Sequence, residues 1–286
     1  MSSPLHSPPR VRVLTDSAAD IAPEVVRALG IVVVPFTIRF GDTVFTDGVD
    51  MDAETFYRTV RERADFPRTS QPSAGLFEEA YRNAHEQGCA VVSIHISSRL
   101  SGSFAGASLA ARNVPQATVH LVDSRLAAMA QGLVVIMAAR MAAVGEAAEN
   151  IVAAANSMCD RIQIAIMVDS LTYLQRGGRI GRAQSMFGSM LSIKPILGIE
   201  DGVISPRQRA RTAMRAVQAM YDLARSLDPL QEVLVLHSNA PALVDELCRL
   251  LTPIYGDPPV GILGPVVGTH VGEGCVAIAM VQTDKR

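Results

Sequence analysis

The sequence predicts an α/β protein, because short apolar runs rich in β-branched residues alternate with helical patterns along most of its 286 residues. Residues 11–17 and 89–96 show the clearest strand patterns, and residues 124–144 show the clearest buried helix. In open α/β sheets, ligands bind beyond the carboxyl ends of the strands. The polar turns next to the predicted strands are therefore the first places to look for a binding site.

A first α/β domain is predicted for residues 11–158. The Pro- and Ser-rich residues 1–10 are expected to be a disordered tail, since they lack the hydrophobic run of a signal peptide. Within the domain, β-branched runs indicate strands, while Gly, Asp and Pro indicate turns and helix ends. In chain order the predicted elements are a strand at 11–17, a short helix ending at Gly30, an extended run at 31–40, a turn at 41–42 before 43–48, a helix at 53–63 capped by Asp52, a helix from Pro72 (capped by Ser70 or Gln71) to Gly88, a strand at 89–96, a helix at 104–113, a strand at 117–124, and helices at 124–144 and 146–158.

A second α/β domain is predicted for residues 159–286, although no Pro- or Gly-rich linker marks the boundary. Strand and helix patterns continue to alternate through it. Its predicted elements are a strand at 161–168, a segment at 171–181, an apolar region at 183–199, a hairpin turn at 200–202, a basic helix from about 207, a strand at 232–238, a helix at 241–252, and a Gly-rich pair of strands within 264–280.

Composition argues against several classes of function. The formal net charge is −2 without a domain-wide basic excess, so a nucleic acid partner is not favoured. The four Cys are scattered without a Cys/His cluster, which predicts reduced thiols in a cytoplasmic protein and no metal site. The apolar stretch at 126–144 contains Gln131 and Arg140 and is too short to span a membrane. The P-loop pattern GxxxxGK[ST] is absent, and no cofactor is predicted.

Two hydroxyl-rich turns precede predicted helices, TSQPS at 69–73 and SSRLSGS at 97–103. Free N–H groups and the helix dipole favour an anion at such positions, although helix capping alone also explains Ser and Thr there. A serine nucleophile is a further alternative because His95 precedes Ser97, but no GxSxG elbow occurs. His270 differs from the other histidines because glycines surround it. The candidate donors in the turns are Thr69, Ser70, Ser97, Ser98, Ser101 and Ser103.

Taken together, these segments resemble the DegV family, the fatty-acid-binding proteins that serve bacterial fatty acid kinase. The usual SGRI of the family is GGRI here, which keeps the arginine and removes one hydroxyl. The motifs that carry the resemblance, between about 11 and 283, are TDSAAD (15–20), TSQPS (69–73), SSRLSGSFAGA (97–107), VDSRLAAMAQG (122–132), RGGRIG (176–181), KPIL (194–197), EDGVISP (200–206), RARTAMRA (209–216) and GPVVGTHVGEG (264–274).

The resemblance implies two α/β domains, a lipid tunnel, and a head-group site near the domain junction. In this family the TSQP hydroxyls, the serine of LSG and the late histidine hold the carboxylate, and neighbouring groups contribute donors. Carried over to this sequence, the implied ligand-binding residues are Thr69, Ser70, Ser98, Ser101, Gly102 and His270.

The resemblance also implies a function. The protein would bind a long-chain fatty acid such as palmitate and present the carboxylate to a separate kinase for acyl-phosphate formation. It would be a carrier rather than an enzyme, with transient contact to a membrane surface. The alternatives are a kinase-independent lipid carrier or sensor, an acyl-transfer enzyme that uses Ser101 or His270, and a phosphate or sugar-phosphate binder.

A charge asymmetry supports a protein partner. Residues 176–215 contain eight basic and two acidic residues, so an acidic kinase surface is a plausible docking partner. A solvated arginine face is the alternative interpretation. The predicted docking residues are Arg176, Arg179, Arg182, Arg209 and Arg211.

Overall fold

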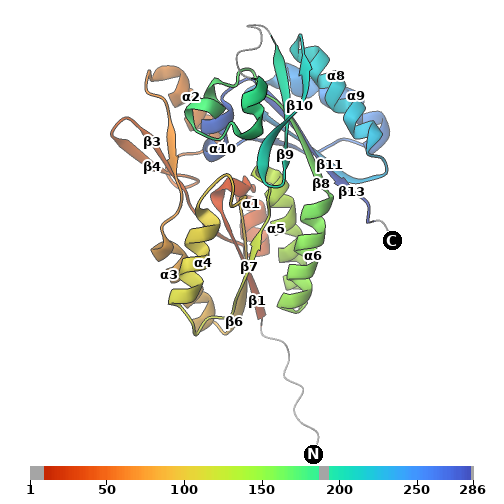
Figure 1. Cartoon of the computed structure of the whole chain (residues 1–286). Helices are drawn as coiled ribbons and strands as arrows, with labels where there is room; N and C mark the ends of the chain where they lie inside the picture. The colour runs from red at the N-terminus through yellow and green to blue at the C-terminus, as the bar shows by residue number, and fades with distance from the viewer. Residues whose placement is uncertain (1–9, 187–192, 285–286) are drawn as a thin grey trace, which may run out of the picture.

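The computed structural model describes residues 10–186 and 193–284, and it confirms the α/β fold class (Figure 1). Its described strands form a parallel sheet, a larger mixed sheet and a small antiparallel sheet. The predicted tail at 1–9 lies outside the described residues. Arg10, which was expected to end that tail, instead begins the first strand because it pairs with Cys89 of the neighbouring strand.

The parallel sheet has the strand order β2-β1-β6-β7, and helices cover both of its faces. Successive side chains of a strand point to opposite faces. Leu14 accordingly packs under α3 and α4, while Val13 packs under α5 and α6. The elements are β1 (Arg10–Asp16), η1 (Ser17–Ala19), α1 (Pro23–Leu29), β2 (Val32–Val34), α3 (Ala74–Glu86), β6 (Cys89–His95), α4 (Ser103–Asn113), β7 (Val119–Asp123), α5 (Ala128–Ala143) and α6 (Ala148–Arg161).

The mixed sheet has the order β10-β9-β8-β13-β11-β12. Helices α8 and α9 cover one face, and α5, α6, α7 and α10 lie toward the other face (Figure 1). The elements are β8 (Ile162–Met167), α7 (Thr172–Arg176), η2 (Gly181–Met186), β9 (Lys194–Glu200), β10 (Val203–Ala210), α8 (Ala213–Ser226), β11 (Leu230–Ser238), α9 (Pro241–Tyr255), β12 (Val260–Ile262), α10 (Pro265–Val271) and β13 (Cys275–Gln282).

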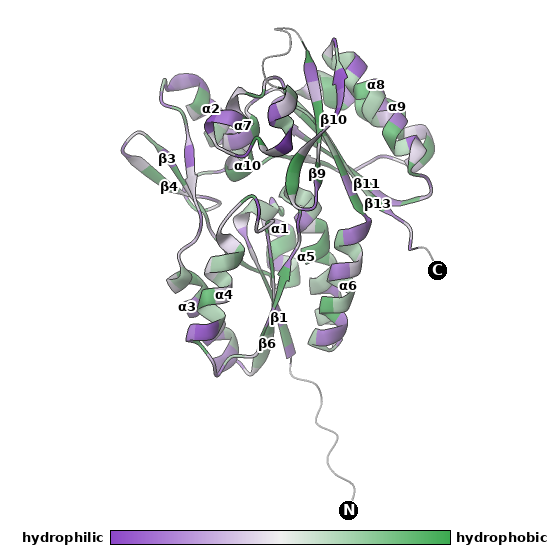
Figure 2. Ribbon diagram, in the orientation of Figure 1, coloured by the Kyte–Doolittle hydropathy of each residue, from purple (hydrophilic) through white to green (hydrophobic). Residues whose placement is uncertain are grey.

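One continuous apolar core joins the parallel sheet to the mixed sheet through α5 and α6. It extends from Val92 on β6, through Val134 and Ile151, to Ile164 on β8 and Ala277 on β13. Figure 2 shows the same pattern, with hydrophobic residues concentrated on the central strands and on the inward faces of the helices. Because this core crosses residue 158, the division into domains 11–158 and 159–286 stays a prediction.

The small sheet holds one of the two hydroxyl-rich turns beside α10. Thr69 pairs with Ile38, and α10 lies against β3, β5 and α2. Ile38, Phe40 and Phe56 form the apolar core of this unit. Its elements are β3 (Thr37–Phe40), β4 (Thr43–Thr46), α2 (Ala53–Glu62) and β5 (Arg68–Ser70).

The basic helix predicted from about residue 207 begins later than predicted. Residues 203–210 form β10, which pairs antiparallel with β9, and α8 begins only at Ala213 after the Thr212 cap. Asp201 and Gly202 both have positive φ and close the hairpin. Pairing with β9 therefore overrides the helical pattern of the arginine-rich segment.

Of the predicted Gly-rich pair of strands, the first is a helix and the second is a strand. Residues 265–271 form α10, which begins at Pro265 and ends before Gly272, where φ is +75°. Only β13 is a strand.

The predicted caps of the helix after TSQP also differ from the structure. Ser70 lies in β5 and Ser73 takes the N-cap position of α3. In the apolar region at 183–199, η2 and β9 are observed, and residues 187–192 lie outside the described residues.

Candidate functional site: a cavity with a polar mouth and an apolar interior

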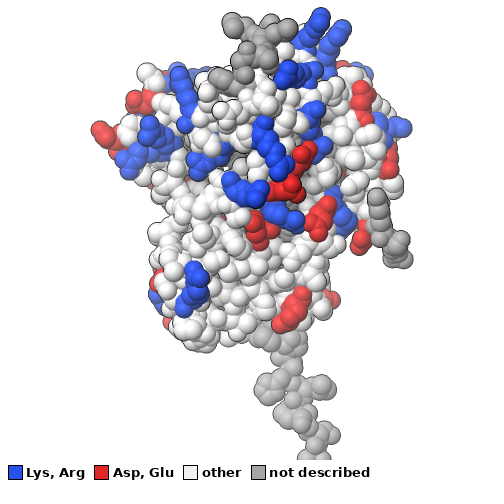
Figure 3. All heavy atoms as spheres, in the orientation of Figure 1, with Lys and Arg blue, Asp and Glu red and all other residues white. Residues whose placement is uncertain are grey.

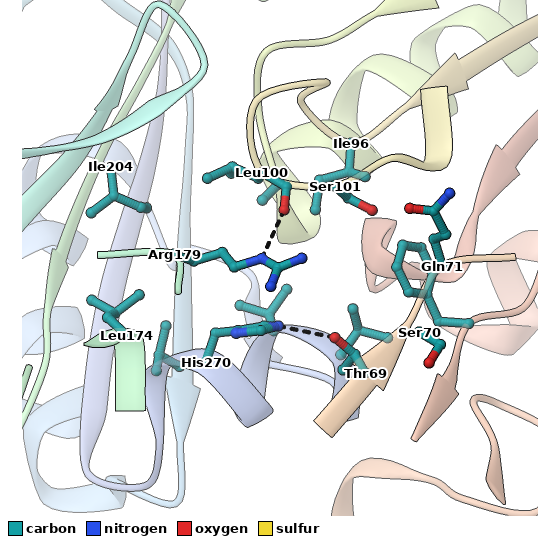
Figure 4. Close-up of a pocket in the computed structure, with 15 residues that line it drawn as sticks. Thr69, Ser70, Gln71, Ile96, Leu100, Ser101, Leu174, Arg179, Ile204 and His270 are labelled. Carbon is teal, nitrogen blue, oxygen red and sulfur yellow. Dashed lines mark hydrogen bonds between the residues drawn. The ribbon is translucent and has the colours of Figure 1, made fainter. Parts of the chain in front are cut away.

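A cavity of about 330 Å³ lies where the small sheet, the parallel sheet and the mixed sheet meet (Figure 4). Its walls combine a few polar groups with a larger number of apolar side chains, which is typical of ligand sites. The residues that line it are Phe36, Thr69, Ser70, Gln71, Ile96, Leu100, Ser101, Ala127, Leu174, Arg179, Ile204, Val266, Val267, His270 and Val271.

Thr69 and His270 form the first polar pair of the site. The Thr69 hydroxyl lies 3.0 Å from His270 Nε2, although 201 positions separate them in the sequence. Burial lowers the pKa of His270 to about 4, and the positive charge of Arg179 adds to this shift. His270 is therefore neutral near pH 7.

The other ring nitrogen of His270 is buried and has no hydrogen-bond partner in the described part of the chain. This Nδ1 atom faces Gly177, where a Cβ would stand only 2.2 Å away. Gly177 occupies the position at which GGRI lacks the hydroxyl of SGRI. The glycine thus lets the imidazole approach the backbone closely and leaves Nδ1 unpaired.

Ser101 contributes the second polar group, from the turn that follows β6. The Ser101 N–H donates to the carbonyl of Ser97 at 3.1 Å, which holds the turn closed. The Ser101 hydroxyl oxygen accepts a hydrogen bond from the Ser103 N–H at 3.2 Å. Accepting this hydrogen bond does not use the hydroxyl's own proton, which can therefore be donated to a ligand in the cavity.

Arg179 is the charged member of the cavity wall, and our sequence analysis had assigned it to partner docking instead. Its Nε donates to the Leu100 carbonyl at 3.0 Å, and its Nη1 donates to the Gly177 carbonyl at 2.7 Å. These two bonds point the guanidinium toward the cavity between His270 and the Ser101 turn (Figure 4). The RGGRIG motif was the only sequence signal that could have indicated this position.

The remaining predicted ligand residues divide into two groups. Ser70 lines the cavity, and so does Gln71, which was not among the predicted ligand residues. Ser98 and Gly102 do not: the Ser98 N–H donates to Asp123, and the Gly102 carbonyl accepts from the Gln71 amide. The structure therefore brings together Thr69, Ser70, Ser101 and His270 but leaves Ser98 and Gly102 outside the lining.

A second, inner cavity of about 60 Å³ continues the first one toward the mixed sheet. The two cavities share five apolar wall residues, Ala127, Leu174, Ile204, Val267 and Val271. Every residue that lines the inner cavity is apolar, and cavities of that kind stay dry. The outer cavity thus supplies polar partners, while the inner cavity accepts only an apolar group.

The other four predicted docking arginines are exposed. In the view of Figure 3, Lys and Arg gather on the half of the molecule that contains the mixed sheet. Arg176 stacks over Phe66, and Arg182 lies near Glu200 and Asp201 at 3.9 and 3.5 Å. Arg209, on β10, reaches the Ser185 carbonyl at 3.4 Å, and Arg211 is exposed.

Residues 10–186 and 193–284 contain neither a metal-binding cluster nor a membrane-spanning helix. No group of three or more His, Cys, Asp or Glu side chains there is arranged to hold a metal ion. No helix in the same residues is long and apolar enough to cross a membrane.

The structure thus combines an α/β fold with a cavity that has polar groups at one end and only apolar groups at the other. The chain belongs to the DegV family, since the model of this family of uncharacterised proteins matches residues 10–283. A DegV domain-containing protein from Streptomyces coelicolor is 35% identical over 277 residues, which cover 94% of this chain and 98% of the relative.

Solved structures of the family share the fold. A DegV family protein from Thermus thermophilus, described for its fatty acid binding, has a TM-score of 0.89 and 30% identity, over 96% of this chain and all (100%) of the other. A stearic acid-binding protein from Eubacterium ventriosum has a TM-score of 0.86 and 26% identity, over 95% and 98% of the two chains.

Proposed function

We propose that this protein binds a long-chain fatty acid, with the carboxylate at Thr69, Ser101 and His270. Its tail would run along the apolar wall of the outer cavity and end in the inner cavity. The observation that carries the proposal is an outer cavity with a few polar groups that continues into a wholly apolar inner one. Relatives of the same fold that bind fatty acids, stearic acid among them, support the same ligand class.

The hydrogen-bond directions around Thr69 suit an anion. A carboxylate only accepts hydrogen bonds, so the Thr69 hydroxyl would donate its one proton to the carboxylate. In its contact with a neighbouring side chain, the Thr69 oxygen must then be the acceptor. His270 Nε2 is that neighbour at 3.0 Å, which requires the tautomer with the proton on Nε2. The unpaired Nδ1 is then a bare lone pair, which agrees with a neutral imidazole.

Arg179 adds a charge to this otherwise neutral set of donors. Two backbone carbonyls already occupy part of its guanidinium, so it attracts the carboxylate without offering the full bidentate fork. A carboxylate oxygen held in this way keeps a lone pair for reaction. The geometry therefore favours presentation of the head group over burying it in a tight ion pair.

The tail supplies most of the binding free energy. Each buried methylene contributes about 0.8 kcal/mol, so a chain of a dozen methylenes gains roughly 10 kcal/mol before the costs of association. This gain favours long chains, because a short acid would leave the inner cavity unfilled.

We further propose that a separate kinase phosphorylates the bound acid. A carboxylate oxygen would attack the γ-phosphorus of ATP, forming a new O–P bond as the bond to ADP breaks, and the product is an acyl phosphate. The chain lacks a P-loop, so the nucleotide site would belong to the kinase. The docking surface would be formed by Arg176, Arg182, Arg209 and Arg211.

An acyl-transfer enzyme is less well supported. Asp16, His95 and Ser93 do line up as an acid, a base and a hydroxyl, at 3.0 and 2.7 Å. All three side chains are fully buried, and neither His95 nor Ser93 lines the outer or the inner cavity. Within the described residues, no base near Ser101 is oriented by a third group, which a serine nucleophile requires.

The proposal is tested by extracting lipid from the purified protein and identifying it by mass spectrometry, together with a titration of lipid-free protein with palmitate. We expect a co-purified fatty acid and saturable binding with an affinity that increases with chain length. Extracts with only background lipid and no palmitate binding would contradict the proposal. Adding ATP and a candidate fatty acid kinase then separates a kinase co-substrate from a kinase-independent carrier.

A further inference from the structure

Asp16, the last residue of β1, is fully buried and surrounded by donors. Its Oδ2 accepts from His95 Nδ1 at 3.0 Å, from the Ile96 N–H at 3.2 Å and from the Ser103 hydroxyl at 2.7 Å. Its Oδ1 accepts from the Gln131 amide at 3.1 Å. Four donors around one carboxyl group leave no acceptor for a carboxylic acid proton, so the arrangement fits a carboxylate.

The network behind His95 fixes the proton positions. With Nδ1–H donating to Asp16, Nε2 accepts from the Ser93 hydroxyl at 2.7 Å, and the Ser93 oxygen accepts from the Tyr81 hydroxyl at 3.0 Å. In this order of protons every donor finds an acceptor, and all four side chains are fully buried. A satisfied buried network of this kind is rigid and resists rearrangement.

Ser103 connects this network to Ser101 in the turn at 97–103. It is the first residue of α4, its hydroxyl is bound to Asp16, and its N–H donates to the Ser101 hydroxyl oxygen at 3.2 Å. Asp16 itself does not line the outer cavity. We infer that Asp16 is a positioning residue which, through Ser103, holds the Ser101 hydroxyl with its oxygen occupied and its proton directed at the ligand carboxylate.

This inference rests on the proposed function and has a specific consequence for ligand choice. Asp16 lines neither the outer nor the inner cavity, so loss of the carboxylate should not weaken binding of the chain as such. It should instead reduce the preference for an acid over its methyl ester, since the ester has no anionic head for Ser101 to recognise. A purely structural role would lower both affinities together.

The test compares palmitate with methyl palmitate in Asp16→Asn, Ser103→Ala and Ser93→Ala, with thermal melting of each variant. In Asp16→Asn the amide places a donor against other donors, and we expect the acid-over-ester ratio to fall about tenfold, as for the loss of ~1.4 kcal/mol. Ser103→Ala removes only the link and should lower the ratio about threefold. Ser93→Ala is the matched control: it removes a buried hydroxyl on the far side of His95 and should leave the ratio unchanged.

The outcomes separate this inference from the proposed function. If the wild-type protein fails to bind palmitate, the proposed function fails first. If it prefers the acid but Ser103→Ala and a folded Asp16→Asn keep that preference, only the positioning role is overturned. Should Asp16→Asn not fold, Ser103→Ala alone decides, and an equal loss in Ser103→Ala and Ser93→Ala would also overturn the role.

Discussion

Ala277 offers a direct test of the inner cavity. It lies on β13, where alternate residues face opposite sides of the mixed sheet, and it lines the cavity while Val276 and Ile278 face α8 and α9. Replacing it by leucine adds three carbon atoms to a space of about 60 Å³. If a fatty acid tail uses that space, roughly three of its methylenes are displaced.

The expected cost follows from the displaced methylenes. At about 0.8 kcal/mol each they amount to ~2.4 kcal/mol, or a roughly fiftyfold weaker affinity. The effect should depend on length, because a short acid leaves the inner cavity unfilled. Ala277→Leu should therefore weaken stearate and palmitate strongly and decanoate little.

Dissociation constants for saturated acids from decanoate to stearate measure this effect. Ala165→Leu is the matched control, since Ala165 is a buried alanine on β8 opposite Ile278, on the α8 and α9 face of the sheet. Overpacking should lower the melting temperature of both variants, but only Ala277→Leu should change the length profile. A loss that is equal at every chain length, or shared by the control, would refute an acyl chain in the inner cavity.

Three further predictions concern the polar end and the docking surface. Burial holds the pKa of His270 near 4, below the usual value of about 6.5, so the unfolded state binds more protons between these values. The free energy of unfolding should therefore fall as pH drops from about 6.5 to 4, and melting temperatures measured across this range should show a smaller fall in His270→Gln. The Gln variant should also bind the ligand better than His270→Ala. Equal binding by the two variants would argue for a structural histidine. Ser101→Ala should weaken palmitate binding by ~1–3 kcal/mol. Ser98→Ala should not, because the Ser98 side chain does not line the cavity. If calorimetry finds the same affinity for both variants, helix capping is the role of both serines. Arg209→Ala should leave palmitate affinity unchanged and should slow phosphoryl transfer by a cognate kinase, most strongly at low salt. Arg179→Ala should change both the palmitate affinity and the transfer rate. If Arg209→Ala leaves the transfer rate unaffected at every salt concentration, Arg209 is only a solvated residue.

Local patterns in the sequence predicted much of the framework correctly. The strand at 89–96 and the helix at 104–113 appear as β6 and α4, because apolar periodicity and turn residues act over short distances. The two hydroxyl-rich turns were also recognisable, since Ser, Thr, Gly and Pro have local backbone reasons to stand there. The predictions were wrong where pairing with another strand determines the secondary structure. The arginine-rich residues of β10 show a helical pattern, but they pair with β9 and form a strand.

By itself, the sequence determined the α/β class, the family motifs and the residue types of the candidate site. Only the tertiary structure decided which of those residues meet. Thr69 and His270 are 201 positions apart, and Arg179 and Leu100 are 79 apart, yet each pair is hydrogen-bonded at the junction of the sheets. The inner cavity likewise depends on residues from five strands and three helices. The physical reason is that hydrogen bonds and apolar contacts act over a few ångströms in space, so their partners are set by how the elements pack and not by spacing along the chain.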